Sequence, residues 1–157
     1  MGQPGMSHAS PARKASLDFA PVVLIADDEP VIRQIYGELL DGQPVRVLTA
    51  ADGQEALALA EAWVPELLVT DIGMPRLDGF GLIRALRRLY PGVPVIVTTG
   101  AEQYSGRLVE DVAAELGVVA ILKKPVELSR LQHAIWSAVP FLGPVPPAPA
   151  ADSIRAA

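Results

Sequence analysis

Acidic, hydroxyl and ammonium side chains stand at the ends of four apolar runs of this chain. They are Asp27, Asp28, Asp71, Thr99 and Lys124. Carboxylates that crowd together raise one another's pKa unless a cation lies between them. Such oxygen ligands suit Mg²⁺, which binds one or two carboxylates and keeps several waters. An ammonium or a hydroxyl group beside them can hold a phosphate. Together these residue types indicate phosphoryl chemistry with a magnesium ion.

The same residues can divide the work of phosphoryl transfer between them. A phosphoryl group has three equatorial oxygens whose charge must be matched in the transition state. Mg²⁺ can take one oxygen, the Lys124 ammonium a second, and the Thr99 hydroxyl or a backbone N–H the third. The Asp71 carboxylate is then the nucleophile, and it forms an acyl phosphate.

Each residue taken alone also has a structural interpretation. Asp28 and Glu29 suit the positive end of a helix that Pro30 opens. A lone acid, threonine or lysine at a strand end is ordinary. The functional interpretation therefore depends on the whole set falling at the ends of the correct strands.

Five apolar runs alternate with amphipathic segments along the chain. The runs are 22–26, 45–49, 67–70, 95–98 and 118–122. Strands without polar alternation are buried on both faces, so the pattern predicts an α/β fold: a doubly wound, five-stranded parallel sheet with five helices on both faces. The flavodoxin-like strand order 2-1-3-4-5 is expected, and ligands of such sheets bind at the carboxyl ends of the strands.

Composition divides the 157 residues into one domain and two terminal segments. Residues 21–139 carry the alternating pattern. Residues 1–20 form a polar N-terminal extension and residues 140–157 a tail rich in Pro and Ala. Neither segment has enough apolar side chains to offset the entropy of ordering it, so both are expected to be disordered.

Charge and composition exclude several functions. The chain has 18 acidic and 13 basic residues, a net charge of -5, which argues against direct nucleic-acid binding and against a basic membrane anchor. It has no cysteine, so thiolate sites and disulfides are excluded. No apolar run reaches the roughly 18 residues that a membrane helix needs, so a cytoplasmic location is expected.

Four segments resemble the response-regulator receiver family, most closely its single-domain chemotaxis-type members, from about Val22 to about Val139. They are Val-Leu-Ile-Ala-Asp27-Asp28-Glu29, Leu-Leu-Val-Thr-Asp71-Ile-Gly-Met-Pro, Pro-Val-Ile-Val-Thr-Thr99-Gly and Ile-Leu-Lys-Lys124-Pro125. The resemblance implies a two-component signalling protein. Asp71 would take a phosphoryl group from a sensor histidine kinase or a histidine phosphotransfer protein.

The resemblance also assigns the remaining site residues. Asp28 would bind Mg²⁺ directly and Asp27 through water, and the backbone carbonyl of Gly73 would complete the protein ligands. Thr99 would hydrogen-bond the phosphoryl group, and Lys124 would pair with it.

Alignment to the motifs chooses between adjacent residues at two strand ends. It selects Thr99 rather than Thr98, and Lys124 rather than Lys123. Neighbouring strand residues point to opposite faces, so each choice excludes the other residue. A cis bond before Pro125 is expected from the same resemblance.

Three positions depart from the family pattern. Ile121 stands where a Tyr or Phe often acts as a rotameric switch, which leaves the readout of phosphorylation open. Gly73 and Ala101 stand where polar side chains often position the attacking water. The phosphoryl lifetime is therefore expected to differ from that of receivers with polar residues there.

Two other functions could use the same set of residues. A phosphatase with an aspartyl-phosphate intermediate commonly carries a second Asp where this chain has Gly73, so no enzyme activity is expected beyond self-catalysed phosphorylation and dephosphorylation. A receiver-like interaction module that is never phosphorylated remains the alternative, and Ile121 favours it.

If the sequence is a complete protein, output is expected through protein contact, because no DNA-binding region follows residue 139; in a longer protein an effector domain could supply the output instead. The surface implied by the resemblance is the fourth helix, fifth strand and fifth helix, which could bind a target protein or a second copy in a homodimer.

Overall fold

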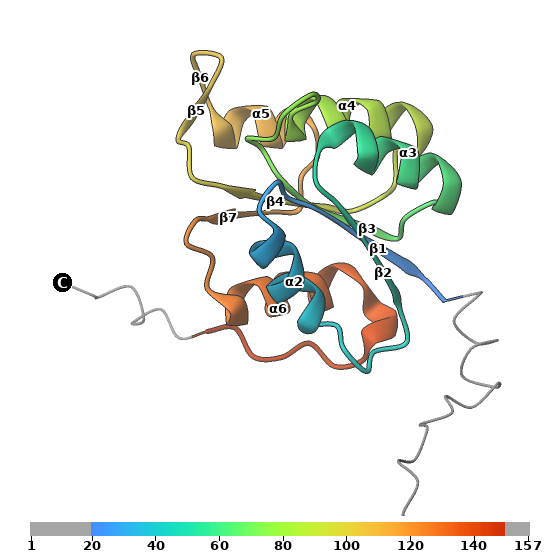
Figure 1. Ribbon diagram of the computed structural model, residues 1–157. Coiled ribbons are helices and arrows are strands. Elements are labelled where there is room, and N and C mark those ends of the chain that lie inside the picture. The colour runs from blue at the N-terminus through green and yellow to red at the C-terminus, as the bar shows by residue number, and fades with distance from the viewer. Residues whose placement is uncertain (1–19, 150–157) are drawn as a thin grey trace, which may run out of the picture.

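The computed structural model describes residues 20–149. Its main sheet contains β1 (Val22–Ala26), β2 (Arg46–Ala50), β3 (Leu67–Asp71), β4 (Val95–Thr99) and β7 (Ala120–Lys123). The helices are α2 (Pro30–Glu38), α3 (Gly53–Trp63), α4 (Gly79–Leu89), α5 (Val109–Glu115) and α6 (Leu128–Ala138). Helices α3, α4 and α5 cover one face of the sheet, and α2 and α6 cover the other (Figure 1).

The five strands are parallel and lie in the order β2-β1-β3-β4-β7. With β7 as the fifth long strand, this is the predicted order 2-1-3-4-5, so the fold class is confirmed. The first and third strands are neighbours, as the proposal of a shared site requires: Ala26 is in register with Thr70, one residue before Asp71.

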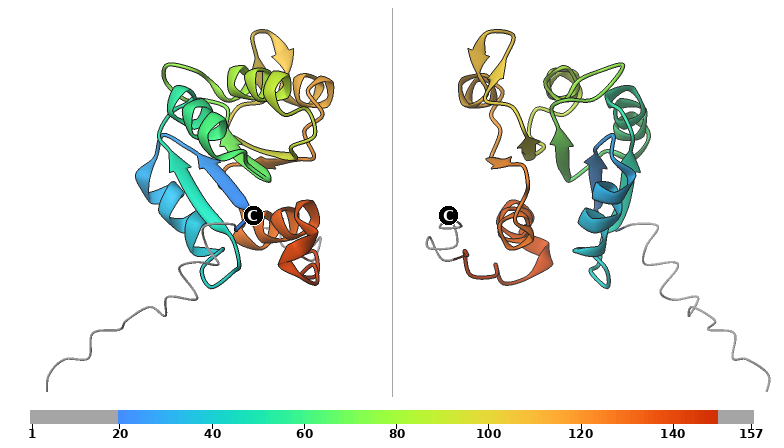
Figure 2. Two further views of the ribbon diagram at one scale, coloured as in Figure 1. Left: turned by 90° about the vertical axis from the view of Figure 1, so that its right-hand side faces the viewer. Right: turned by 60° about the vertical axis from the view of Figure 1, so that its left-hand side comes forward.

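Two apolar clusters, one on each face of the sheet, hold the layers together. Leu24 and Leu68 point into the first cluster, with α3, α4 and α5. Val23 and Ile25 point into the second, with α2 and α6. Because successive strand residues alternate between faces, an uninterrupted apolar run supplies both clusters at once. Figure 2 shows the two helix layers separated by the sheet from two further directions.

A short hairpin between β4 and α5 was not predicted. Strands β5 (Gln103–Tyr104) and β6 (Arg107–Leu108) pair antiparallel around Ser105 and Gly106, which have φ values of 51° and 77°. Two positive φ values in sequence are typical of the tight turns that join hairpin strands. The hairpin projects beyond the helix layer of α4 and α5 (Figure 1).

Local hydrogen bonds hold the start of α4 against the end of β3. The Asp78 side chain caps α4 by accepting a hydrogen bond from the Gly81 N–H at 2.7 Å. The Gly79 N–H donates to the Ile72 carbonyl at 2.8 Å. A Cβ at Gly79 would lie 2.1 Å from the Asp71 carbonyl oxygen, so only glycine allows this approach.

The chain after α6 begins with a turn that packs on the domain. Pro140–Leu142 forms a 3₁₀ helix (η1), and Leu142 is buried in the second cluster. The tail predicted from residue 140 therefore starts with residues that belong to the core, because Leu142 supplies apolar surface to it. The predicted N-terminal extension, up to residue 19, and residues 150–157 lie outside the described residues. Within residues 20–149, no helix has the length and apolar character needed to cross a membrane.

Candidate functional site

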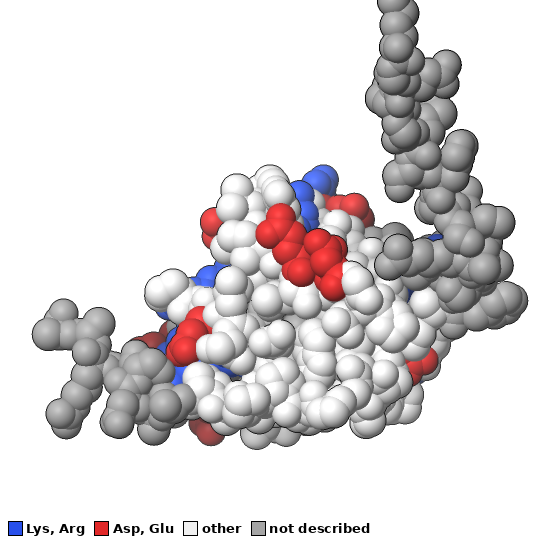
Figure 3. Space-filling model, turned by 90° about the horizontal axis from the view of Figure 1, so that it is seen from below, with Lys and Arg blue, Asp and Glu red and all other residues white. Residues whose placement is uncertain are grey.

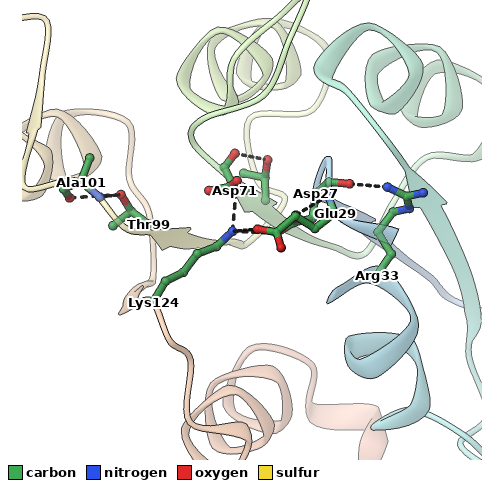
Figure 4. Close-up of polar contacts among 8 residues, drawn as sticks. Asp27, Glu29, Arg33, Asp71, Thr99, Ala101 and Lys124 are labelled. Carbon is green, nitrogen blue, oxygen red and sulfur yellow. Dashed lines mark hydrogen bonds and ion pairs between the residues drawn. The ribbon is translucent and has the colours of Figure 1, made fainter. Parts of the chain in front are cut away.

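The ammonium of Lys124 lies between two buried carboxylates at the carboxyl edge of the sheet (Figure 4). Its Nζ is 3.1 Å from Oδ2 of Asp27 and 3.2 Å from Oδ2 of Asp71. The exposed Glu29 carboxylate is 3.9 Å away. Lys124 is held there by its own backbone, because its N–H donates to the Thr99 carbonyl at 2.8 Å. One lysine therefore joins the ends of three strands.

Opposing effects act on the pKa of Lys124. Partial burial alone lowers the pKa, since it disfavours the charged form. The hydrogen bond to Asp27 and the charges of Asp71 and Asp27 outweigh burial, so the pKa of Lys124 is raised. The ammonium is consequently charged throughout the physiological range, as a phosphate-binding group must be.

Asp27 is fixed by its neighbours along the chain. It is 1% exposed, and its Oδ1 accepts a hydrogen bond from the Glu29 N–H at 2.9 Å. The Arg33 guanidinium donates to its backbone carbonyl at 2.7 Å. These contacts leave the Asp27 Oδ2 directed at Lys124 (Figure 4).

Asp71 is 7% exposed at the end of β3. Burial raises the pKa of its carboxyl, and the nearby Lys124 ammonium partly offsets that increase. The Thr70 hydroxyl donates to the Asp71 carbonyl at 2.8 Å and so stiffens the strand end. A buried carboxylate that faces a cation and an open pocket is a suitable nucleophile.

Asp27, Asp28 and Asp71 together fit a divalent cation. Each offers one carboxylate oxygen, and the three oxygens lie within 4.8 Å of one another. Asp28 is exposed and open to solvent, whereas the other two are buried. This set of hard oxygen ligands with water access matches the coordination that Mg²⁺ prefers. Gly73, whose carbonyl was predicted as a further ligand, is exposed in the loop after β3, and it lines a pocket together with Asp71 and Lys124.

The two threonines at the end of β4 have different surroundings. Thr99 lines a pocket of about 460 Å³ together with Asp71 and Lys124. Thr98 is fully buried, and its hydroxyl has no hydrogen-bond partner among residues 20–149. The Thr99 hydroxyl donates to the Ala101 carbonyl at 3.1 Å and accepts from the Ala101 N–H at 2.9 Å. It is therefore beside the pocket but engaged with its own loop.

Ile121 lies away from the pocket. It pairs with Val97 in the sheet and packs against the first apolar cluster. Of the adjacent lysines, Lys124 reaches the carboxylates, while Lys123 is exposed at the end of β7. The peptide bond between Lys124 and Pro125 is cis, as expected.

Sequence reasoning missed three aromatic or polar neighbours of this edge. Tyr36, from α2, is 3% exposed, and burial raises its pKa to about 12. Asp78 and Tyr104 line the pocket and are hydrogen-bonded to each other at 2.7 Å. A tyrosine at a helical apolar spacing signals Tyr36 as a core residue, but no local pattern connects Tyr104 to a residue 26 positions earlier.

Comparison with known sequences agrees with this geometry. Residues 23–136 match the family described as the response regulator receiver domain. The Regulator of RpoS of Escherichia coli (strain K12) is 33% identical over 118 residues, which are 73% of this chain and 34% of that protein. The probable transcriptional regulator ycf27 of Porphyridium aerugineum is 36% identical over 115 residues, 73% of this chain and 46% of that protein. The chain thus spans less than half the length of these curated relatives.

Solved structures give the same result for the fold. The chemotaxis protein CheY4 of Vibrio cholerae superposes with a TM-score of 0.67 at 28% identity, over 76% of this chain and 99% of that one. The signal receiver domain of an HD-domain-containing protein from Pseudomonas fluorescens Pf-5 gives 0.68 at 27% identity, over 76% and 94%. On the family match, the relatives and the fold, this chain belongs to the response regulator receiver family of two-component systems.

Proposed function

We propose that this receiver is phosphorylated on Asp71 with the help of Mg²⁺, and that it signals through contact with other proteins. The observation that carries the proposal is the position of the Lys124 ammonium, 3.2 Å from Asp71 and 3.1 Å from Asp27. A cation held there, beside an open pocket, can bind the incoming phosphoryl group by charge. The three carboxylates within 4.8 Å supply the second cation site that the reaction needs.

The proposed transfer step uses a phosphohistidine of a kinase or phosphotransfer protein as the donor. A carboxylate oxygen of Asp71 attacks the phosphorus, a P–O bond forms, and the P–N bond to the imidazole breaks. The leaving imidazole takes a proton from solvent, so its ring becomes neutral. Lys124 neutralises one phosphoryl oxygen, and the Thr99 hydroxyl donates to another once it turns away from Ala101.

Asp28, Asp71 and the Gly73 carbonyl, with Asp27 through water, would hold a magnesium ion, which would supply positive charge beside the phosphoryl oxygens. The protein's own part is to hold the carboxylates in place. Asp27 is fixed through its backbone by Arg33, and Asp71 is fixed through its carbonyl by Thr70. Asp28 is exposed, so its carboxylate is open to solvent.

A groove beside Lys124 supports docking of the donor protein. It has a volume of about 580 Å³ and lies between α2 and α6; its lining includes Ile32, Ile35, Val126 and Leu128. Lys124 and Glu29 form its end nearest the site. The face of the molecule formed by α2 and α6 is mostly uncharged, with a compact acidic group (Figure 3). An apolar groove ending at the phosphoacceptor suits a helix that presents a phosphohistidine.

The proposed output surface is the face formed by α5, β7 and α6, where β7 is the edge strand of the sheet. Val119, just before β7, is 57% exposed, and Leu108, just before α5, is 50% exposed. Exposed apolar side chains around an edge strand offer a contact surface for a target protein or a second copy.

The proposed function is tested by intact-mass measurement after incubation with acetyl phosphate and Mg²⁺. One added phosphoryl group is expected, absent when EDTA removes the metal and absent in Asp71→Asn. A control variant, Asp41→Asn, changes an exposed acid outside the site and should be phosphorylated normally. An unchanged mass with Mg²⁺ present would favour the module that is never phosphorylated.

A further inference from the structure

We propose that Tyr104 is a positioning residue of the phosphorylation site, whose bond to Asp78 holds the β5–β6 hairpin in the unphosphorylated arrangement. This inference rests on the proposed phosphorylation of Asp71. The hairpin would then transmit the phosphorylation state of the site, the role that a Tyr or Phe at position 121 often has in the family.

Contacts at both ends fix the Tyr104 side chain. Its hydroxyl donates to Oδ2 of Asp78 at 2.7 Å. Its ring meets the buried Phe80 ring edge to face, with centroids 4.7 Å apart and planes at 74°. Both partners belong to the start of α4, so Tyr104 ties the hairpin to that helix.

Asp78 joins this contact to the phosphoacceptor. Its other oxygen, Oδ1, caps α4 through the Gly81 N–H. The residue after it, Gly79, donates to the carbonyl of Ile72, which follows Asp71 directly. Tyr104 is thus two hydrogen bonds and a short stretch of backbone away from the phosphoacceptor.

Thr99 supplies the second connection, from the opposite side of the pocket. Its hydroxyl both donates to and accepts from Ala101, two residues before the hairpin begins. To donate to a phosphoryl group it must give up its bond to the Ala101 carbonyl. The hairpin is closed at its base by the Val109 N–H bond to Glu102 at 3.0 Å, so a shift at Ala101 moves it as one unit.

The consequence is an equilibrium between two arrangements of one loop. In the free protein, the Thr99–Ala101 and Tyr104–Asp78 contacts hold the loop together. In the phosphorylated protein, Thr99 turns to the phosphoryl group, and the hairpin and Tyr104 are released from that arrangement. Binding equilibria are reciprocal, so a contact that favours the free arrangement must weaken phosphoryl binding by the same factor.

Three other positions near the site are less suited to this role. Ile121 has no polar group and packs into the first apolar cluster rather than the pocket. Gly73 and Ala101 have no polar side chain to contribute. Among the residues that line the pocket, Tyr104 alone is aromatic, and it alone links the hairpin to α4.

The test uses the full chain with Mg²⁺ and beryllofluoride, a phosphoryl analogue, followed by backbone amide NMR. Tyr104→Phe keeps the ring and removes the hydroxyl, which is hydrogen-bonded to Asp78 and also to Arg84. We expect it to lower the half-saturating beryllofluoride concentration about fivefold or more, the usual size of a coupling between two sites. Before beryllofluoride is added, the amide signals of residues 101–104 should already lie part-way toward their saturated positions. If Tyr104 had only a structural role, its replacement would not shift these amide signals toward their saturated positions.

Two further variants make the result decisive. Tyr104→Leu also removes the ring contact with Phe80 and should move the signals further in the same direction. Tyr90→Phe makes the same chemical change at the far end of α4 and should behave as wild type. If Tyr104→Phe binds beryllofluoride no more tightly than wild type, with its signals at the wild-type free positions, the inference is overturned. If wild type itself binds no beryllofluoride with Mg²⁺, the proposed function fails as well.

Discussion

The apolar clusters on the two faces of the sheet and the polar edge at its carboxyl end are built in opposite ways. The clusters contain Val, Leu, Ile and aromatic side chains, with several residues at 0% exposure. The edge contains two buried carboxylates and a partly buried lysine; the pKa of Asp71 is raised by burial, and the pKa of Lys124 is raised by the neighbouring carboxylates. The clusters therefore stabilise the fold, whereas burying charged groups at the edge costs part of that stability.

The largest effect on stability is expected in a cluster. Leu131→Ala, in α6, removes a side chain that is 0% exposed, and should lower the free energy of unfolding by about 2–5 kcal/mol. Urea unfolding followed by circular dichroism measures this change. Leu128→Ala in the same helix, at 41% exposure, is the matched control and should cost far less. Equal losses of stability in Leu131→Ala and Leu128→Ala would contradict the claim that the buried clusters stabilise the fold. Phosphorylation of Leu131→Ala should persist wherever the variant remains folded.

The next largest effect is expected at the lysine between the carboxylates. Lys124→Met leaves Asp27 and Asp71 facing each other without an ammonium between them. In EDTA this should lower the free energy of unfolding by about 2 kcal/mol. Breaking a fully buried ion pair usually costs about 3–5 kcal/mol, and the expected cost is smaller because Lys124 is partly exposed. The same variant should bind Mg²⁺ at least fivefold more tightly, since one unit charge at 4 Å is worth about 1 kcal/mol even in water. Isothermal titration calorimetry measures the affinity. Weaker Mg²⁺ binding would show that Lys124 does not compete with the metal.

A smaller and opposite effect is expected at the phosphoacceptor. The pKa of Asp71 is raised in the folded state, so its contribution to stability is present below its unfolded value of about 3.9 and is lost as pH rises through the folded pKa. Asp71→Asn removes that loss and should be more stable than wild type at pH 7 without Mg²⁺. Denaturation curves from pH 7 down to pH 4 should show the gain shrinking. A constant gain, or a destabilised variant, would contradict the sign of the shift.

The smallest effect on stability is expected in the loop beside the site. A Cβ added at Gly73 meets no atom within 4 Å, so Gly73→Ala should change the free energy of unfolding by less than about 0.5 kcal/mol. The rate of loss of the phosphoryl group should change more than stability does, because the new methyl group stands at the rim of the pocket. Thermal unfolding and a time course of intact mass measure the two effects. A large loss of stability would contradict the open space seen there.

The difference between clusters and edge also explains what the sequence could predict. The apolar runs and their helical partners follow from periodicity alone, and the fold and strand order followed from them. The site residues stand at strand ends, and the topology of a parallel sheet brings strand ends together. Asp27, Asp71 and Lys124 could therefore be placed side by side from the pattern and the family resemblance.

Contacts made by single side chains across long sequence separations could not be predicted. The guanidinium of Arg87, on α4, donates to the carbonyls of Leu116, Gly117 and Val93 and ties α4 to the loop before β7. The β5–β6 hairpin has strands of two residues each, too short for an alternating pattern. Its turn residues, Ser105 and Gly106, were the only local signal.

The central claim concerns which of three neighbouring carboxylates is phosphorylated. Borohydride reduces an aspartyl phosphate to homoserine, so peptide mapping after reaction with acetyl phosphate, Mg²⁺ and borohydride identifies the residue directly. Homoserine is expected at position 71 alone, since Asp71 faces both Lys124 and the pocket, whereas the Asp27 carboxylate is held by Glu29 and Lys124. Homoserine at position 27 or 28, or at no position, would contradict the account.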